Sequence, residues 1–163
     1  MPAASYAVLY DFEAQLEAAF SAALTADSLT NYTSLATTDK EGPFIVAQVT
    51  VGGGLRQYDQ GLSKGNSAFN FEVELQICTN RTSSTGNTDH ATYRGKVRNI
   101  MERWLASGTQ SGGSAMNARL TYLVIDDLAR TGGSRGVDSE SRYDITTETY
   151  SGVFRIKSDA WPS

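Results

Sequence analysis

Few residues in this chain have the types and spacing that chemistry requires. His90 is the only histidine, and it follows Asp89 where we expect a helix to begin. A histidine beside an aspartate could serve a hydrolytic triad with one of the many serines. The chain lacks the Gly-x-Ser-x-Gly turn that presents such a serine. We therefore interpret His90 as an exposed residue at a helix start, without a catalytic role.

Paired carboxylates are the next candidates. Glu72 and Glu74 lie two positions apart in an alternating segment, which places them on one face of a strand about 7 Å apart. Glu148 is a candidate third member of this group. Carboxylates at such spacing occur in glycosidases, but no aromatic subsite motif lies nearby, which favours an ordinary wet sheet face. Asp126 and Asp127 are adjacent and would point to opposite faces of a strand, so they indicate an acidic turn.

Cysteine and glycine usage excludes other kinds of site. Cys78 is the only cysteine, which excludes an internal disulfide and a cysteine-based zinc site. Its strand position predicts a half-exposed residue that packs as a small hydrophobe and is not a reactive thiol. The glycines at 52–54 lack the Gly-Lys-Ser/Thr ending of a phosphate-binding loop. We expect no cofactor, no metal and no enzymatic activity.

Charge and length indicate a soluble protein of one domain, residues 1–163. The net charge of −4 is modest, which argues against a general nucleic-acid binder and for a protein that meets other proteins. The start, Met1–Ser5, has no features of a signal peptide, and no stretch is long and apolar enough to span a membrane. The expectation is a chain made and folded in the cytoplasm, with no membrane contact.

Two helices are expected from apolar residues that recur every three or four positions. The first runs from Leu9 to Leu24, with acidic residues near its start that suit the helix dipole. The second runs from Asp89, as its capping residue, to Leu105. Its side away from the apolar stripe is basic and carries Arg94, Lys96, Arg98 and Arg103. This side is either a solvated face or a surface for an acidic protein or nucleic acid.

One segment has the clearest strand pattern. From Phe69 to Ile77 apolar and polar residues alternate, which predicts a strand with one dry face and one wet, acidic face. Glycines 52–54 should end an earlier strand, and Gly152 indicates a bulge in the last one. The other expected strands are Phe44–Val51, Ala118–Leu128 and Arg142–Ile156. The predicted fold is α+β, a mainly antiparallel sheet with two amphipathic helices packed on one face.

Long polar connections join these elements, at Asp27–Glu41, Gly52–Ala68, Thr109–Ser114 and Ala129–Ser141. Long loops in a compact domain usually bind something or are mobile, and residues 129–141 suggest a flexible hairpin tip with charges of both signs. We place contacts with a second subunit or a partner in these loops and on the basic helix side. The candidate contact residues are Arg56, Tyr58, Lys64, Arg94, Arg98, Arg130, Arg135, Asp138 and Glu140.

The order of these elements resembles the tail terminator, or tail completion, proteins of long-tailed bacteriophages. The strand Phe69–Ile77, which runs through a polar turn into the helix Asp89–Leu105, carries this resemblance. So does the closing strand Arg142–Ile156, with Trp161 just behind it. The resemblance covers most of the chain and is one of pattern, not of a diagnostic motif. The same fold occurs in head–tail joining proteins.

This resemblance implies a structural virion protein with an α/β sandwich fold. Such proteins form a ring, here expected to be a homohexamer, at the head-proximal end of the tail. Their partners are the tail tube and the neck or connector proteins, and DNA passes through the lumen without sequence-specific binding. The resemblance implies no catalytic residues. The location it implies is the tail or neck of a virion.

Two alternatives remain beside the tail terminator hypothesis. A head–tail joining or adaptor protein has the same pattern and differs only in its neighbours. A small hydrolase or ligand-binding domain would use Glu72, Glu74 and His90, and predicts a monomer with a concave polar pocket. In the leading hypothesis, sheet edges and charged loops make subunit contacts, with the basic helix side and the acidic sheet face as complementary surfaces.

Overall fold

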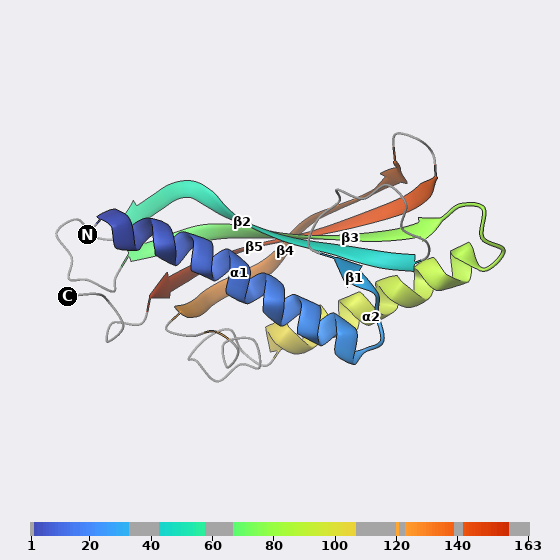
Figure 1. The fold of residues 1–163 in the computed structure, drawn as a ribbon, viewed down its shortest axis with the longest axis horizontal. Coiled ribbons are helices and arrows are strands. Elements are labelled where there is room, and N and C mark those ends of the chain that lie inside the picture. The colour runs from blue at the N-terminus through green and yellow to red at the C-terminus, as the bar shows by residue number, and fades with distance from the viewer. Residues whose placement is uncertain are drawn as a thin grey trace.

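Seven elements build the protein in a computed structural model that describes residues 2–32, 43–57, 67–106, 120, 123–138 and 142–156. In chain order they are α1 Pro2–Ala26, β1 Asn31–Tyr32, β2 Pro43–Gln57, β3 Ser67–Asn80, α2 Gly86–Ala106, β4 Leu123–Val137 and β5 Tyr143–Ile156. The strands form one sheet in the order β1-β2-β3-β5-β4, and only the β1–β2 pair is parallel. Both helices lie along one face of this sheet (Figure 1). The expected α+β fold is confirmed.

The central strand β3 sets the two faces of the sheet. Its residues Phe69, Phe71, Val73, Leu75 and Ile77 are all buried in the main core with residues of both helices. We call this side the inner face and the opposite side the outer face. Successive strand residues point to opposite faces, so the polar residues between them lie on the outer face, as the alternation predicted.

Aromatic rings join α1 to the sheet. The ring of Phe12 in α1 stacks on that of Phe154 in β5, with centroids 3.5 Å apart, and meets Phe71 edge-on at 4.9 Å. α2 adds Val97, Ile100 and Met101 to the same core. Burying a large apolar side chain contributes roughly 1.5–3 kcal/mol, so this contact is a major source of stability for the helix layer.

A Schellman turn ends α1 and positions the residues that contact α2. Ser28 has a φ of 60°, the N–H of Leu29 donates to the carbonyl of Leu24, and the N–H of Ser28 donates to that of Thr25. This pattern satisfies carbonyls that the last turn of a helix leaves without partners. The turn leaves Asp27 at the end of α1, beside α2, and directs the chain into β1.

Several expected element boundaries are wrong, and α1 begins at Pro2, earlier than Leu9. For the strands the reason is that pairing within the sheet overrides the local signals. β1 lies in a segment expected to be a loop, and β2 continues through the glycines at 52–54 after a register shift between Val51 and Leu55. β4 includes most of the expected flexible tip, because residues 132–137 pair with β5. α2 begins at Gly86, three residues before Asp89, and Thr85 Oγ1 donates to Asp89 Oδ2 at 2.7 Å.

A small second core lies on the outer face, at the end of the sheet where β2 begins. Phe44, Val46 and Cys78 are buried there, with Tyr143 packed against them. Cys78 is only 1% exposed, so the expectation of a half-exposed position is wrong, whereas its interpretation as a packed small hydrophobe is confirmed. Burial, helped by the charge of Asp138, raises the pKa of the Cys78 thiol to about 12, which makes it a poor nucleophile.

Gly152 allows the closest approach in the sheet. A Cβ atom at this position would overlap the backbone carbonyl of Asp127 and lie 2.8 Å from two ring atoms of Phe71. The β3–β5 register continues through Gly152, so the predicted bulge is wrong at this position. The register shifts lie instead in β4, the strand beside it, between Ile125 and Asp127 and between Arg130 and Gly132.

We expect Gly152→Ala to destabilise the protein by about 1–3 kcal/mol or more, because the added methyl overpacks the core. The matched control is Gly95→Ala in α2, where an added Cβ meets nothing within 4 Å. This control should gain about 0.5–1 kcal/mol from helix propensity. Urea unfolding of both variants measures the difference, and equal effects would contradict the packing described here.

Candidate functional site

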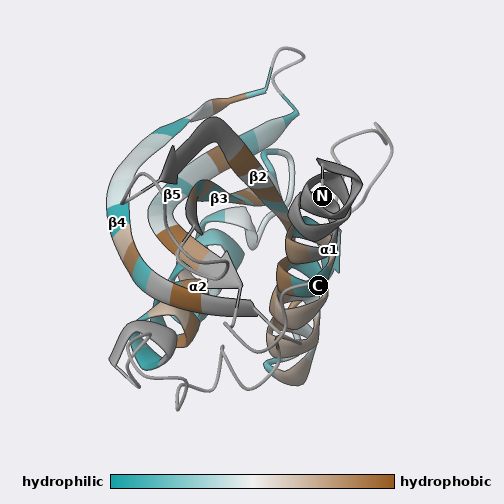
Figure 2. Ribbon diagram, turned by 90° about the vertical axis from the view of Figure 1, so that its left-hand side faces the viewer, coloured by the Kyte–Doolittle hydropathy of each residue, from teal (hydrophilic) through white to brown (hydrophobic). Residues whose placement is uncertain are grey.

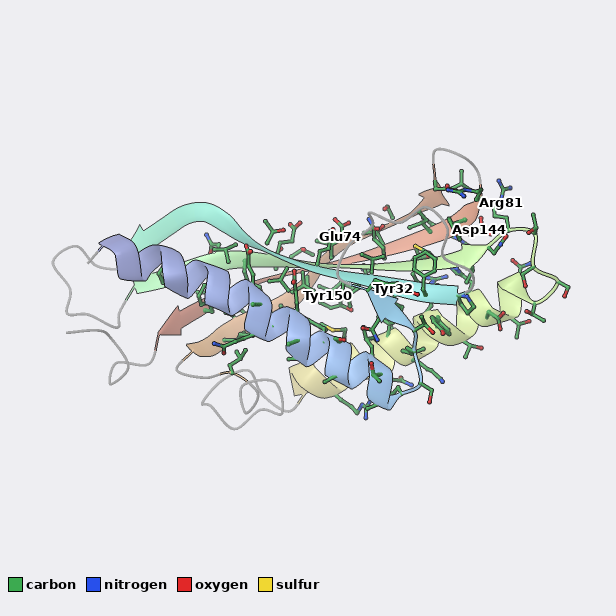
Figure 3. The ribbon with its side chains drawn as sticks, in the orientation of Figure 1. Tyr32, Glu74, Arg81, Asp144 and Tyr150 are labelled. Atoms are coloured by element: carbon green, nitrogen blue, oxygen red, sulfur yellow. The ribbon has the colours of Figure 1, made fainter. Side chains whose placement is uncertain are left out.

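The inner face of β5 carries a row of polar residues where an apolar row would be usual. Asp144, Thr146, Glu148 and Tyr150 follow one another at alternate positions on this face. Asp144 forms an ion pair with Arg81 at 3.6 Å, at the end of the sheet shown in Figure 3. The other three residues lie deeper and are buried. Buried polar groups require partners, so this row determines what surrounds it.

Glu148 is the centre of this row. It is 7% exposed, and its Oε2 accepts a hydrogen bond from Arg130 Nε of β4 at 2.5 Å. Its Oε1 lies 3.9 Å from Arg98 Nη2 of α2. One carboxylate therefore links α2, β4 and β5. A buried charge of this kind is tolerated only with such partners, and removing them would leave it uncompensated.

Gly133 provides the space that Arg130 needs. A Cβ atom at Gly133 would overlap Nη2 of Arg130 and lie 3.3 Å from the carbonyl oxygen of Thr147. The guanidinium therefore lies across the backbone at Gly133 on its way to Glu148. The hydrogen bond and the charge of Glu148 raise the pKa of Arg130, which keeps this side chain charged at any ordinary pH.

His90 occupies the next part of the row and is buried, at 4% exposure. The expectation of an exposed histidine at a helix start is therefore wrong, because α2 begins earlier and turns His90 onto the sheet. Its Nδ1 lies 2.7 Å from Thr79 Oγ1 of β3, and its Nε2 lies 2.7 Å from Thr146 Oγ1 of β5. Each hydroxyl can donate or accept, so both partners suit a neutral imidazole.

Charges around His90 disfavour its protonation. Burial lowers the pKa of His90, and the charges of Arg135 in β4 and Arg94 in α2 lower it further. Asp144 of β5 acts in the opposite direction and more weakly. Arg94 and Arg135 therefore both lie near enough for their charges to act on the same histidine, although 41 positions separate them in the sequence.

Four of the predicted contact residues are thus brought together. Arg98 and Arg130 meet at Glu148, and the charges of Arg94 and Arg135 both act on His90. All four are exposed. We call Arg94, Arg98, Arg130 and Arg135 the basic cluster. Two of these arginines belong to α2 and two to β4, the last strand of the sheet, which forms the outermost arc of the ribbon in Figure 2.

The other predicted contact residues do not join the basic cluster. Asp138 closes the hairpin between β4 and β5, where its Oδ1 accepts the N–H of Tyr143 at 2.7 Å. Arg56 lies in β2, but its side chain is outside the described part of the structure. Tyr58, Lys64 and Glu140 lie outside the described residues altogether.

The remaining basic residues of α2 hold the two helices together. Lys96 Nζ donates to the carbonyl of Asp27 at 3.1 Å, and Arg103 Nη2 lies 2.9 Å from Asp27 Oδ2. Cations are favourable at the C-terminal end of a helix, which here is the end of α1. The basic side predicted for this helix is therefore divided between an internal role and the basic cluster.

The outer face carries charge of the opposite sign. Glu72 is exposed, and Glu74 lies two positions further along β3, where its Oε1 accepts a hydrogen bond from Gln76 at 2.6 Å. We call Glu72 and Glu74 the acidic patch. Polar residues of β2 and β5 surround it, namely Gln48, Thr50, Thr147, Thr149 and Ser151. Glu74 lies on the side of the sheet away from the helices and Tyr150 on the helix side (Figure 3).

Two sequence-based groupings are wrong. Glu148 lies on the inner face, so it cannot join Glu72 and Glu74. The group proposed for a hydrolase is also divided, because His90 lies beneath the inner face and both glutamates lie on the outer face. Within the described residues no group of three histidine, cysteine, aspartate or glutamate side chains could hold a metal ion. Neither described helix is long and apolar enough to cross a membrane.

Two carboxylates of α1 close one edge of the sheet, a role that was not predicted. The N–H of Val51 donates to Glu13 Oε1 at 2.9 Å, and that of Val49 donates to Glu17 Oε1 at 3.1 Å. Four helical residues rise about 6 Å and two strand residues about 6.7 Å, so the spacings match. The i, i+4 spacing of the glutamates was the only signal in the sequence, and helix-dipole effects explained it equally well.

The pKa of His90 predicts a loss of stability in mild acid. Because this pKa is lowered on folding, the neutral histidine stabilises the fold fully above about pH 6.5. That contribution is lost as the pH falls through the folded-state pKa. Urea unfolding from pH 7.5 down to 5 should show a steeper loss for the native protein than for His90→Asn. Equal slopes would contradict this assignment.

The carboxylates of α1 should stabilise the edge of β2 through hydrogen bonding. We expect Glu13→Ala and Glu17→Ala each to lower the free energy of unfolding by about 1–3 kcal/mol, since each leaves a strand N–H without its acceptor. Glu13→Gln and Glu17→Gln retain an acceptor oxygen and should lose less. Urea unfolding measures the values, and equal losses for Ala and Gln would rule out this role.

Comparison with known proteins does not assign this chain to a family. No protein-family model matches the chain, and no curated protein matches it. A function must therefore be argued from the geometry of the basic cluster, the acidic patch and the sheet edges.

Proposed function

We propose that this chain is a structural protein that assembles with copies of itself, as a tail terminator does at the head-proximal end of a bacteriophage tail. In this proposal a ring of subunits, of which six is the expected number, joins the tail tube to the neck proteins of the virion. The element order that resembles tail terminators is part of the support. The rest comes from the charged surfaces.

The observation that carries the proposal is the placement of the two charged surfaces. The basic cluster lies beside α2 on the inner side, and the acidic patch lies on the outer face of the same sheet. Two copies related by a two-fold axis would place like charge against like charge. A head-to-tail contact places the basic cluster of one copy on the acidic patch of the next, and repetition of such a contact gives a ring or a filament.

The strength of such charge pairs limits what they can do. An exposed ion pair contributes roughly 0.2–1 kcal/mol, which is too little to hold a subunit alone. Complementary charge chiefly determines which surfaces meet and how fast they find each other. The area between the subunits would supply the rest, and stable interfaces typically bury about 1,200–2,000 Å².

Two neutral variants test the head-to-tail contact. Glu72→Gln with Glu74→Gln removes the acidic patch, and Arg94→Gln with Arg98→Gln removes half of the basic cluster. Each double variant should assemble more weakly than the native protein, because every contact then lacks part of its charge complementarity. Mixed together, they should form a one-to-one complex more readily than either variant assembles alone, since each variant retains one intact surface.

Native mass spectrometry and sedimentation velocity would measure these species. A double variant of Lys96 and Arg103 to Gln is the matched control, because it removes the same charge from α2 at the contact with α1. A mixture that remains monomeric, or variants that assemble as the native protein does, would contradict the head-to-tail contact. Attachment of purified tails to heads would then distinguish a terminator from an adaptor.

A further inference from the structure

We propose that the free edge of β4, from Gly132 to Val137, binds an extended acidic segment of a partner protein, which adds to the sheet as a further strand. This inference shares Arg135 with the basic cluster, but its test does not require ring formation, because the assembly test alters Arg94 and Arg98 and leaves Arg135 in place. It rests on the difference between the two edges of the sheet, on the local backbone of β4, and on two side chains.

The two edges of the sheet differ. On the β2 side, β1 pairs with Ile45 and Val46, and the glutamates of α1 take the N–H groups of Val49 and Val51. On the other side β4 is the last strand, and in the described part of the chain only β5 pairs with it. A free edge presents N–H and C=O groups that another strand can pair with.

The segment Gly132–Val137 is the regular part of this edge. Both register shifts of β4 occur before it, and its residues pair without interruption with Thr149 to Asp144 of β5. Six residues of strand span about 20 Å, enough for an added strand of ordinary length. The residues on its outer side are Gly132, Ser134 and Gly136, and nothing lies within 4 Å of a Cβ built at either glycine. These small residues leave space on the outer face beside an added strand.

Side chains on the inner side of this segment specify the partner. Arg135 and Val137 lie two positions apart on that side, and Val137 is 49% exposed, the only large hydrophobic residue so exposed within the described chain. Residues opposite each other on paired strands have Cβ atoms about 4.5–5.5 Å apart. An added strand would therefore gain from an acidic residue opposite Arg135 and an apolar residue two positions away.

Pairing of β4 with β4 of a second copy is disfavoured by the same side chains. The inner side of β4 carries Arg130 and Arg135, so two antiparallel copies would bring arginines of both chains together on one side. Like charges across a strand pair are destabilising. At the edge of β2 the N–H groups of Val49 and Val51 are already bonded to glutamates of α1, which disfavours this edge as the partner strand. An acidic extended segment from another protein fits both constraints.

A synthetic peptide tests this inference on the full chain. The probe is a fluorescent decapeptide in which every second residue is threonine and the residues between them are valine and glutamate in turn. We expect it to bind the native protein, and Arg135→Glu to weaken binding by about tenfold or more, since attraction becomes repulsion. Arg103→Glu makes the same charge change at the α1–α2 contact and should leave binding unchanged. Fluorescence anisotropy measures the affinities.

Two control peptides separate strand addition from simple charge attraction. A peptide with lysine in place of glutamate should not bind. A peptide N-methylated at successive amides keeps its charge but has no N–H left to donate on either strand edge, so it should lose binding as well. On binding, amides of Gly132–Val137 should become protected from hydrogen exchange. Failure of the probe to bind, equal binding of the N-methylated peptide, or no effect of Arg135→Glu would each overturn the inference.

Discussion

The alternation of β3 is the constraint on which the rest of the structure depends. β3 lies at the centre of the sheet and pairs with β2 and β5 along its length, so its register fixes which face every other strand presents. Its five apolar residues on the inner face form the surface on which α1 and α2 pack. A shift of one residue would move Glu72 and Glu74 beneath the helices and expose the core. The acidic patch and the core are therefore two consequences of one pattern.

β5 departs from this separation of an apolar inner face and a polar outer face, and this departure accounts for part of the basic cluster. Its inner side carries Thr146 and Glu148 where apolar residues would be expected, and both are buried. Burial of these groups requires partners, which α2 supplies as His90 and Arg98 and β4 supplies as Arg130. The side chains of Arg98 and Arg130 reach this row and still remain exposed to solvent. Part of the basic cluster is thus present at the surface because buried Glu148 needs charged partners. The cluster lies on the inner side and the acidic patch on the outer face because β5 and β3 belong to the same sheet.

The sequence predicted the parts of the structure that depend on local periodicity. The alternation from Phe69 to Ile77 and the apolar stripes of both helices were sufficient for the α+β fold and for the acidic outer face. Periodicity could not tell which side of β5 is inner, because both of its sides are polar near the hairpin, and Glu148 was therefore grouped with the wrong residues. The burial of His90 and the contact of Glu13 and Glu17 with β2 depend on how α1 and α2 lie on the sheet. No local pattern encodes that placement.

The solution mass of the purified protein, measured by light scattering across protein concentration and salt, tests head-to-tail association most directly. We expect a species several times the 17.6 kDa chain mass that grows with concentration. Raising the salt should shrink it, since screening shortens the Debye length from about 10 Å at 0.1 M to about 3 Å at 1 M. A mass that stays at 17.6 kDa at every concentration and at low salt would contradict association through the two charged surfaces.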